Sequence, residues 1–192
     1  MSSRSRVRDK WRLKKWYTVF ASNAFGGAEI GSIPADDPSK LYGRVIDTSL
    51  SDLTGDFSLL HVKLYFQIVE VEDFICKSIF KGHSLTRDYL RSLIRRGSTR
   101  IDGIFRVTTK DGYALRVSVT ALTRHRAKTS QGRAIRKIMR DIVSSKGENL
   151  TFDEFIQQAV LGKIASEIYN EARKIYPLRK VELRKSKLLA AP

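Results

Sequence analysis

The sequence predicts an α+β protein: a small closed or nearly closed β-barrel flanked by amphipathic helices, with basic extensions at both ends. Three observations support this class. Six to eight short segments have the alternating apolar pattern of strands. One long segment changes its alternation phase partway, as a strand does when it bends from one sheet face towards another. Three further segments carry apolar residues at helical spacing, with charged residues on the opposite side.

The composition fits one domain with a core of its own. The chain has 192 residues, and 42% of them are hydrophobic. No run of about eighteen apolar residues and no signal-peptide pattern occurs, so we expect a soluble, cytoplasmic protein without membrane contact. The single cysteine, Cys76, excludes an internal disulfide framework and a multi-cysteine zinc site. We divide the chain into a basic arm (1–15), a barrel body with flanking helices (16–176) and a basic C-terminal segment (177–192).

The net charge of +16 is unevenly distributed. Residues 84–146 carry 16 Lys or Arg against four Asp or Glu, and residues 173–192 carry seven against one. Residues 16–83 instead carry five against nine. A protein that is charged only for solubility does not need such segregation, whereas a polyanion binder whose core elements do not touch the ligand would show it.

The N-terminal arm is rich in Lys and Arg and poor in apolar residues. On its own we expect residues 2–15 to be disordered and to become ordered on a partner such as RNA. Trp16 opens a strand, which favours a role in fixing the arm to the body. Trp11 fits base stacking and attachment to the body equally well.

Strand patterns dominate residues 16–80. Three short strands are predicted, at 16–21, 28–33 and 44–50. The strongest pattern covers Leu60–Val71, where apolar residues alternate as far as Ile68 and the phase then moves to Val69 and Val71. This one-residue shift predicts a β-bulge. A further strand is predicted at 74–80.

A basic amphipathic helix is predicted at 84–96, in the sequence SLTRDYLRSLIRR. Its apolar side comprises Leu85, Tyr89, Leu90, Leu93 and Ile94. Arg87, Arg91 and Arg95 follow one another at intervals of four along the exposed side, and Arg96 and Arg100 lie beyond them. For a single helix of this kind, a solvated basic face is the favoured interpretation.

Residues 99–109 and 113–122 predict a hairpin. The apolar residues of both segments have odd numbers, and directly paired residues share a face, so odd positions must pair with odd positions. This parity favours a three-residue loop, Lys110-Asp111-Gly112, with Gly112 in the left-handed region. The pattern places Arg100, Arg106 and Arg116 on the outer face.

The segment from Thr123 to Arg140 repeats the basic-helix pattern. It begins as a cationic loop and enters a helix with Ser130 as the predicted N-cap. Ile135, Ile138, Met139, Ile142 and Val143 form one apolar stripe, and Arg133, Arg136, Lys137 and Arg140 lie almost opposite. The repetition favours a binding surface over a solvated face. Gly147 is the predicted end of this helix.

The last third of the chain predicts one more helix and a final strand. Thr151 to Glu154 has the pattern of a capping box, and an apolar stripe continues to Pro177 with a bend expected at Gly162. This helix is acidic outside, which indicates an element that docks on the core and does not contact a polyanion. Residues 178–189 predict a cationic edge strand.

The sequence offers little for catalysis. His61, His83 and His125 are scattered, and Cys76 lies in an apolar strand pattern that favours an inert buried thiol over a thiol–imidazole pair with His83. The spacing of the aspartates between residues 47 and 56 matches no Ca²⁺ loop. No phosphate-binding glycine loop or nucleophile elbow occurs. We expect no catalytic activity, no cofactor and no metal.

Five blocks, in order along nearly the whole chain, point to one family. They are KKWYTV (14–19), DLTGDFSLLHVKLYFQI (52–68), GHSLTRDYLRSLIRRGSTRIDGIF (82–105), SQGRAIRKIM (130–139) and KIYPLRKVELRKSKLL (174–189). The chain resembles the eS-one (S-three-A-e) family of small-subunit ribosomal proteins, and its short C-terminus is similar to the archaeal members. The resemblance implies a barrel with flanking helices on the platform of the small subunit, near the messenger exit and the 3′ region of its RNA. It implies no catalysis.

We therefore expect a structural, RNA-binding constituent of the small ribosomal subunit. Its expected partners are the subunit's rRNA, neighbouring ribosomal proteins and messenger RNA near the exit. The alternative is a free translation factor with a barrel fold that binds messenger RNA or rRNA; an RNA-processing enzyme is a further rival. The basic residues expected to contact RNA are Lys14, Lys15, Arg87, Arg91, Arg95, Arg96, Arg100, Arg124, His125, Arg126, Lys128, Arg133, Arg136, Lys137, Arg140, Arg179, Lys180, Arg184, Lys185 and Lys187.

Overall fold

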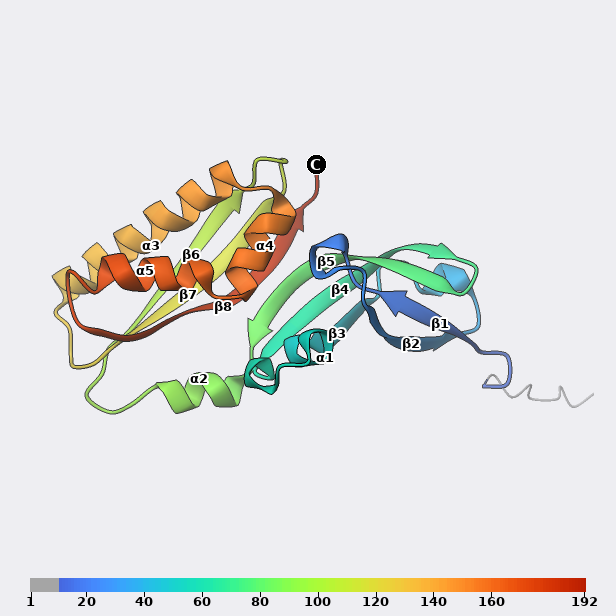
Figure 1. The fold of residues 1–192 in the computed structure, drawn as a ribbon, viewed down its shortest axis with the longest axis horizontal. Coiled ribbons are helices and arrows are strands. Elements are labelled where there is room, and N and C mark those ends of the chain that lie inside the picture. The colour runs from blue at the N-terminus through green and yellow to red at the C-terminus, as the bar shows by residue number, and fades with distance from the viewer. Residues whose placement is uncertain (1–10) are drawn as a thin grey trace, which may run out of the picture.

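The computed structural model describes residues 11–192, which form an eight-stranded mixed sheet with helices packed against it (Figure 1). The strands are β1 (Lys15–Phe20), β2 (Glu29–Ala35), β3 (Val45–Ser49), β4 (Val62–Glu72), β5 (Ile75–Leu85), β6 (Arg100–Thr108), β7 (Ala114–Thr123) and β8 (Leu178–Ala190). The α-helices are α1 (Leu50–Thr54), α2 (Arg87–Leu93), α3 (Thr129–Asn149), α4 (Phe152–Val160) and α5 (Lys163–Ala172). Three single 3-10 turns are η1 (Asn23–Phe25), η2 (Pro38–Lys40) and η3 (Phe57–Leu59). Within this range no helix has the length and apolarity needed to cross a membrane.

Strand β5 joins the two halves of the sheet (Figure 1). One of its edges pairs with β4 along its length. Its other edge is divided: the first residues pair with β1 in parallel, and the last pair with β8 in antiparallel fashion. The two halves therefore diverge from β5, and within residues 11–192 the outer strands β2, β3 and β6 do not pair with one another. The α+β class is confirmed. The sheet is open, so the expected closed barrel is not confirmed.

The main core lies between the β6–β7–β8 half of the sheet and the helices α3, α4 and α5, which cover one face of it (Figure 1), and it continues through Leu64 and Phe66 on β4 and Phe80 on β5. Ile135, Met139 and Val143 on α3 are buried there, as the apolar stripe predicted. A smaller core under the other half includes Tyr17 and Cys76. Full burial of an Ile, Met or Val side chain stabilises the folded state by about 1.5–3 kcal/mol. The apolar stripes therefore fix the orientation of the helices.

Two predicted features of the strands are confirmed. The register of β4 against β5 shifts between Ile68 and Glu70, where the change of phase predicted a bulge. In the β6–β7 hairpin, odd positions pair with odd positions, and Gly112 has a φ of +82° in the loop. The Thr109 N–H donates to the Tyr113 carbonyl oxygen at 2.9 Å and closes a three-residue loop.

The first basic helix and the final strand differ from the prediction. Residues 84 and 85 belong to β5, so α2 begins at Arg87 and ends at Leu93. β8 is not an edge strand, because it lies between β5 and β7. Its cations are on one face only, and Leu178, Val181, Leu183, Ser186 and Leu188 are buried on the other. A strand with many Lys and Arg residues on one face can therefore lie in the interior of a sheet and need not be an edge strand.

Helix α3 starts earlier and ends later than predicted. Lys128, not Ser130, is the N-cap, and its N–H donates to Gln131 Oε1 at 2.9 Å. Gly147 lies inside the helix, which continues to Asn149. A β-carbon at Gly147 would overlap Cγ1 of Val107 and lie 3.1 Å from the Thr108 carbonyl oxygen. This glycine permits the close approach of α3 to β6 and does not end the helix.

The following acidic segment forms two helices instead of one bent helix. α4 begins after Thr151 as predicted, and the Thr151 N–H donates to Glu154 Oε2 at 3.1 Å. Gly162 adopts a left-handed conformation, with a φ of +78°, and separates α4 from α5. Both helices pack on the main core, which confirms the docking role. Of the predicted N-terminal arm, residues 1–10 lie outside the described range.

His83 fastens β5 to β8. It is buried, and its Nε2–H donates to the Leu183 carbonyl oxygen at 3.0 Å, so Nδ1 must accept from the Ser186 hydroxyl at 2.6 Å. Ser186 Oγ in turn accepts the His83 N–H at 3.1 Å. Burial lowers the pKa of His83, so the ring is neutral in the folded protein. The imidazole is occupied by this network and is not paired with the thiol of Cys76.

The neutral state of His83 makes folding sensitive to acid. Its contribution to the free energy of unfolding is complete above the ordinary pKa of histidine, and it is lost as the pH falls below that value, because the unfolded chain takes up a proton that folded His83 does not. We expect the free energy of unfolding to fall between pH 7 and pH 5 with a slope of up to about 1.4 kcal/mol per pH unit from this residue. Urea titrations at several pH values measure it. His83→Gln should lose this slope, whereas His125→Gln, on an exposed loop, should keep it; equal slopes for wild type and His83→Gln would contradict the assignment.

Candidate RNA-binding surface

The open face of the β6–β7–β8 half carries a row of cations. Arg106 pairs directly with Arg116 in the register of β6 and β7, and Arg116 pairs directly with Lys187 in the register of β7 and β8. All three side chains are exposed, on the side of the sheet opposite α3, α4 and α5. We call these three residues the cation ladder.

The cation ladder is costly without a ligand. Directly opposed like charges on neighbouring strands destabilise a sheet by about 0.2–1 kcal/mol per pair. The ion pairs of residues 11–192 include none of the three ladder residues. A row of negative charges lying across the strands would relieve this repulsion. Phosphates of a nucleic-acid backbone offer such a row.

A groove beside α2 gathers more cations. Its cavity volume is ≈ 740 Å³, and it lies among α2, the start of β4, the end of β5 and the adjoining parts of β6 and β8. Asp88 is the one acidic residue that lines it. Its basic lining residues are Lys63, Arg87, Arg91, Arg100, Arg184 and Lys185. We call this site the α2 groove.

The register explains how distant segments reach the α2 groove. Lys63 on β4 pairs with Ser84 on β5, and Ser84 pairs with Lys185 on β8. Lys185 pairs in turn with Ser118 on β7. A second row therefore crosses the sheet beside the cation ladder, and five predicted RNA-binding residues lie in one groove. Arg100 is partly engaged, because its Nε lies 2.9 Å from Asp102 Oδ2.

The cations of α3 follow the edge of β6. Arg133, Arg136, Lys137 and Arg140 are all exposed, as predicted. Arg136 Nε donates to the Asp102 carbonyl oxygen at 2.9 Å, so this row meets the sheet at its free edge. Arg140 Nε lies 3.6 Å from a carboxylate oxygen of Asp141. α3 itself covers the face of the sheet opposite the cation ladder, so the α3 row borders the ladder's surface and does not lie on it.

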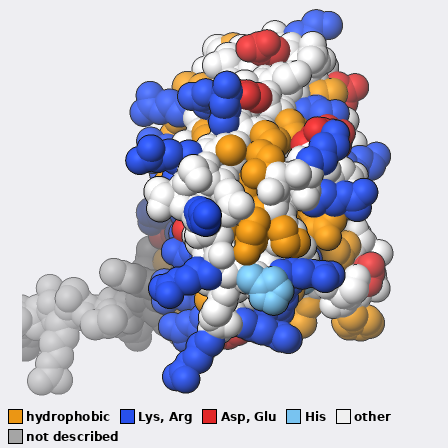
Figure 2. Space-filling model, turned by 90° about the vertical axis from the view of Figure 1, so that its left-hand side faces the viewer, with side chains coloured by type: hydrophobic (Ala, Val, Ile, Leu, Met, Phe, Trp, Pro, Cys, Tyr) orange, Lys and Arg blue, Asp and Glu red, His pale blue; other side chains and the backbone are white. Residues whose placement is uncertain are grey.

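The loop between β7 and α3 presents its basic side chains outwards. Arg124, His125, Arg126 and Lys128 are exposed. The backbone is held in place, because Tyr176 Oη donates to the Arg126 carbonyl oxygen at 3.0 Å and Thr123 Oγ1 donates to the His125 carbonyl oxygen at 2.6 Å. This loop lies at the left end of Figure 1, and Figure 2 shows that end with Lys and Arg side chains around a strip of apolar ones.

The remaining predicted residues are less favourably placed. Lys14 and Lys15 lie at the start of β1, at the other end of the molecule (Figure 1). Arg179 is half-buried. Lys180 Nζ lies 3.0 Å from Glu182 Oε1. Burial lowers the pKa of Lys180, but its hydrogen bonds to Tyr89 and Glu182 have the larger effect, so the pKa is raised overall. Arg95 and Arg96 are exposed in the turn after α2.

Three residues of this surface were not among the predicted RNA contacts. Arg106 and Arg116 were expected on the outer face, but the hairpin alone did not show that Lys187 completes their row. Lys63 gave no signal, because it occupies an ordinary outward position of a strand whose neighbours in space belong to other segments. The β7–β8 register would have completed the row of Arg106 and Arg116, and the β4–β5 and β5–β8 registers would have placed Lys63.

The comparisons with known proteins agree on one family. The model of the Ribosomal S3Ae family matches residues 2–192. The chain is 55% identical over 194 residues to the small ribosomal subunit protein eS1 of Desulfurococcus amylolyticus, covering 100% of this chain and 91% of that protein. It is 58% identical over 186 residues to the protein of that name from Staphylothermus marinus, covering 97% and 88%. For Sulfurisphaera tokodaii the identity is 52% over 192 residues, covering 100% of both chains.

Proposed function

The chain belongs to the Ribosomal S3Ae family, and from this membership we propose that it is a structural constituent of the small ribosomal subunit that binds rRNA. The observation that carries the RNA-binding part is the cation ladder, because three opposed cations without a carboxylate partner are stabilised by a polyanion. The α2 groove extends the same surface, and the cations of α3 and of the loop of residues 124–128 border it.

The proposed contacts are to the RNA backbone. Arg and Lys neutralise phosphates and fix the orientation of the protein, but phosphates carry no sequence information, so recognition depends on the shape of folded rRNA. The protein then works in the cytoplasm, as part of the ribosome, among neighbouring ribosomal proteins. A position on the platform, with messenger RNA passing near the exit, is the further part of this proposal and follows from the family resemblance.

Salt titration tests the electrostatic part. If six to ten phosphates are engaged, the affinity of the full chain for the naked small-subunit rRNA should fall on the order of 10³–10⁵-fold between about 50 and 200 mM salt, because bound counterions are released on binding. Filter binding at a series of salt concentrations measures the slope. An affinity that does not change over this range would contradict the proposal.

Sedimentation separates a subunit constituent from a free translation factor. We expect the protein to stay with small subunits through a gradient after a high-salt wash, because many contacts must break together for it to leave. A protein found at the top of the gradient after such a wash would favour the factor instead.

A further inference from the structure

The surface around Phe57 is apolar and lies apart from the cation ladder. Phe57 is 87% exposed, more than any other large hydrophobic side chain of residues 11–192, and Leu60 is 60% exposed. Leu59 and His61 line a groove of ≈ 190 Å³ that Leu161 also lines. Leu161, in the turn between α4 and α5, is 55% exposed. We call Phe57, Leu60 and Leu161 the Phe57 patch.

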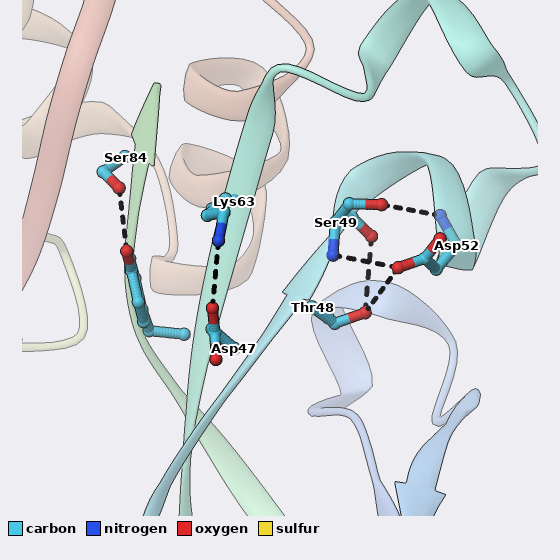
Figure 3. Close-up of polar contacts among 7 residues, drawn as sticks. Asp47, Thr48, Ser49, Asp52, Lys63 and Ser84 are labelled. Carbon is cyan, nitrogen blue, oxygen red and sulfur yellow. Dashed lines mark hydrogen bonds and ion pairs between the residues drawn. The ribbon is translucent and has the colours of Figure 1, made fainter. Parts of the chain in front are cut away.

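The Phe57 patch is held rigidly. The Ser58 N–H donates to Asp56 Oδ1 at 2.9 Å, which caps the turn η3 that carries Phe57. The preceding helix α1 is capped at its N-terminus, where the Asp52 N–H donates to Ser49 Oγ and the Ser49 N–H donates to Asp52 Oδ2 (Figure 3). Leu59, next to the patch, packs on the main core. The backbone that carries the Phe57 ring is therefore held in place, which lowers the entropy cost of binding a partner.

The segment that carries Phe57 and Leu60 is acidic, and among residues 11–192 the one cation that lines the neighbouring groove, Lys180, is paired with Glu182 at 3.0 Å. Residues 45–62 contain Asp47, Asp52 and Asp56 and no Lys or Arg. Lys63, the next cation along the chain, has its Nζ 3.3 Å from Asp47 Oδ2 (Figure 3). Hydrogen bonds from Ser49 and from Ser58 lower the pKa values of Asp52 and Asp56, so both carboxylates stay ionised. An RNA phosphate would be repelled here, whereas Lys or Arg would be attracted.

We propose that the Phe57 patch docks a neighbouring protein whose surface has an apolar pocket bordered by Lys or Arg. This inference rests on the proposed function, since it takes the neighbour from the small subunit. The exposed aromatic ring supplies the anchor that fills the partner's pocket, and Asp52 and Asp56 supply charge complementarity at the rim. A second copy of this chain fits poorly, because its net charge of +16 opposes self-association.

A photo-crosslinker at position 57 identifies the occupant. The full chain carrying Phe57→p-benzoylphenylalanine is assembled into small subunits, irradiated and analysed by mass spectrometry. We expect a crosslink to another ribosomal protein, at an apolar segment flanked by Lys or Arg. Crosslinks to rRNA, to a second copy or to no macromolecule would overturn the inference. Failure of the proposed function looks different, since neither this variant nor the wild type would then sediment with small subunits.

Substitution measures the strength of the contact. Phe57→Ala combined with Leu60→Ala should leave the melting temperature and the affinity for naked rRNA nearly unchanged, because both side chains are exposed and neither belongs to the cation ladder or lines the α2 groove. Retention in subunits after a high-salt wash should fall at least about tenfold, as expected for an anchor residue. The matched control is Val69→Ala, which removes apolar surface that is 51% exposed on β4, and it should retain wild-type behaviour. Equal retention of the double variant and the control would overturn the inference.

Discussion

Gly82→Ala should lower the free energy of unfolding by about 3 kcal/mol, because one added methyl group must displace backbone at the junction of the two half-sheets. A β-carbon at Gly82 would overlap the carbonyl oxygen of Ser186 and lie 3.2 Å from Cα of Lys187. Both atoms belong to the backbone of β8, so no change of side-chain rotamer can relieve the overlap. The displacement also disturbs the hydrogen bonds between His83 and Ser186.

Thermal and urea denaturation of the full chain test this expectation, with a fall in melting temperature of about 6–12 °C. Gly132→Ala is the matched control. Gly132 lies in α3, and its added β-carbon would be 3.9 Å from Ile101 Cδ1, an ordinary van der Waals contact. This substitution should stabilise the protein by about 0.5–1 kcal/mol, because alanine has the higher helix propensity. If the free energy of unfolding of Gly82→Ala lay within about 1 kcal/mol of the wild-type value, the expectation would be wrong, and β5 and β8 would separate easily.

Local patterns were sufficient for the elements whose partners are near in the sequence. The β6–β7 hairpin was predicted correctly because parity ties its apolar residues to one face and leaves only an odd loop length. The bulge after Ile68 and the start of α4 after its N-cap Thr151 have similar local causes. Gly162 and Gly147 were misassigned because a glycine in a helical pattern is equally compatible with a bend, an end or a close contact. These cases can be distinguished only when the element packed against the glycine is known, as β6 with Val107 is for Gly147.

That the sheet stays open, and does not close into the expected barrel, was not predictable from the same patterns. An alternating strand shows which side is buried but not which strand borders each edge. β5 divides one edge between β1 and β8, and the pairing with β8, which joins His83 to Ser186 across 103 positions, leaves no local signal. The candidate site follows the same logic: exposed cations such as Arg91 and Arg133 were placed on the correct sides of their helices. Their grouping into a ladder and a groove required the register of β8.

Replacing the three ladder residues, Arg106→Gln, Arg116→Gln and Lys187→Gln together, should weaken binding to naked small-subunit rRNA on the order of 10²–10³-fold at about 0.1 M salt. Each lost phosphate contact removes about one released counterion, so the slope of log affinity against log salt should decrease in magnitude by about 3. The fold should not suffer, because removing directly opposed like charges favours the sheet. The melting temperature should therefore stay level or rise while RNA binding falls, and this opposite response separates a binding role from a structural one.

A second triple variant removes the same charge from elsewhere. Lys40, Lys77 and Lys174 are each ion-paired with carboxylates, at Asp37, Glu72 and Glu171 respectively. Changing these three lysines to Gln lowers the net charge by the same amount as the ladder variant. If the long-range field of a basic protein caused the binding, both triple variants would lose affinity equally. We expect the ladder variant alone to lose it, because RNA phosphates bind at contact distance and screening by salt confines the effect to about 10 Å at 0.1 M.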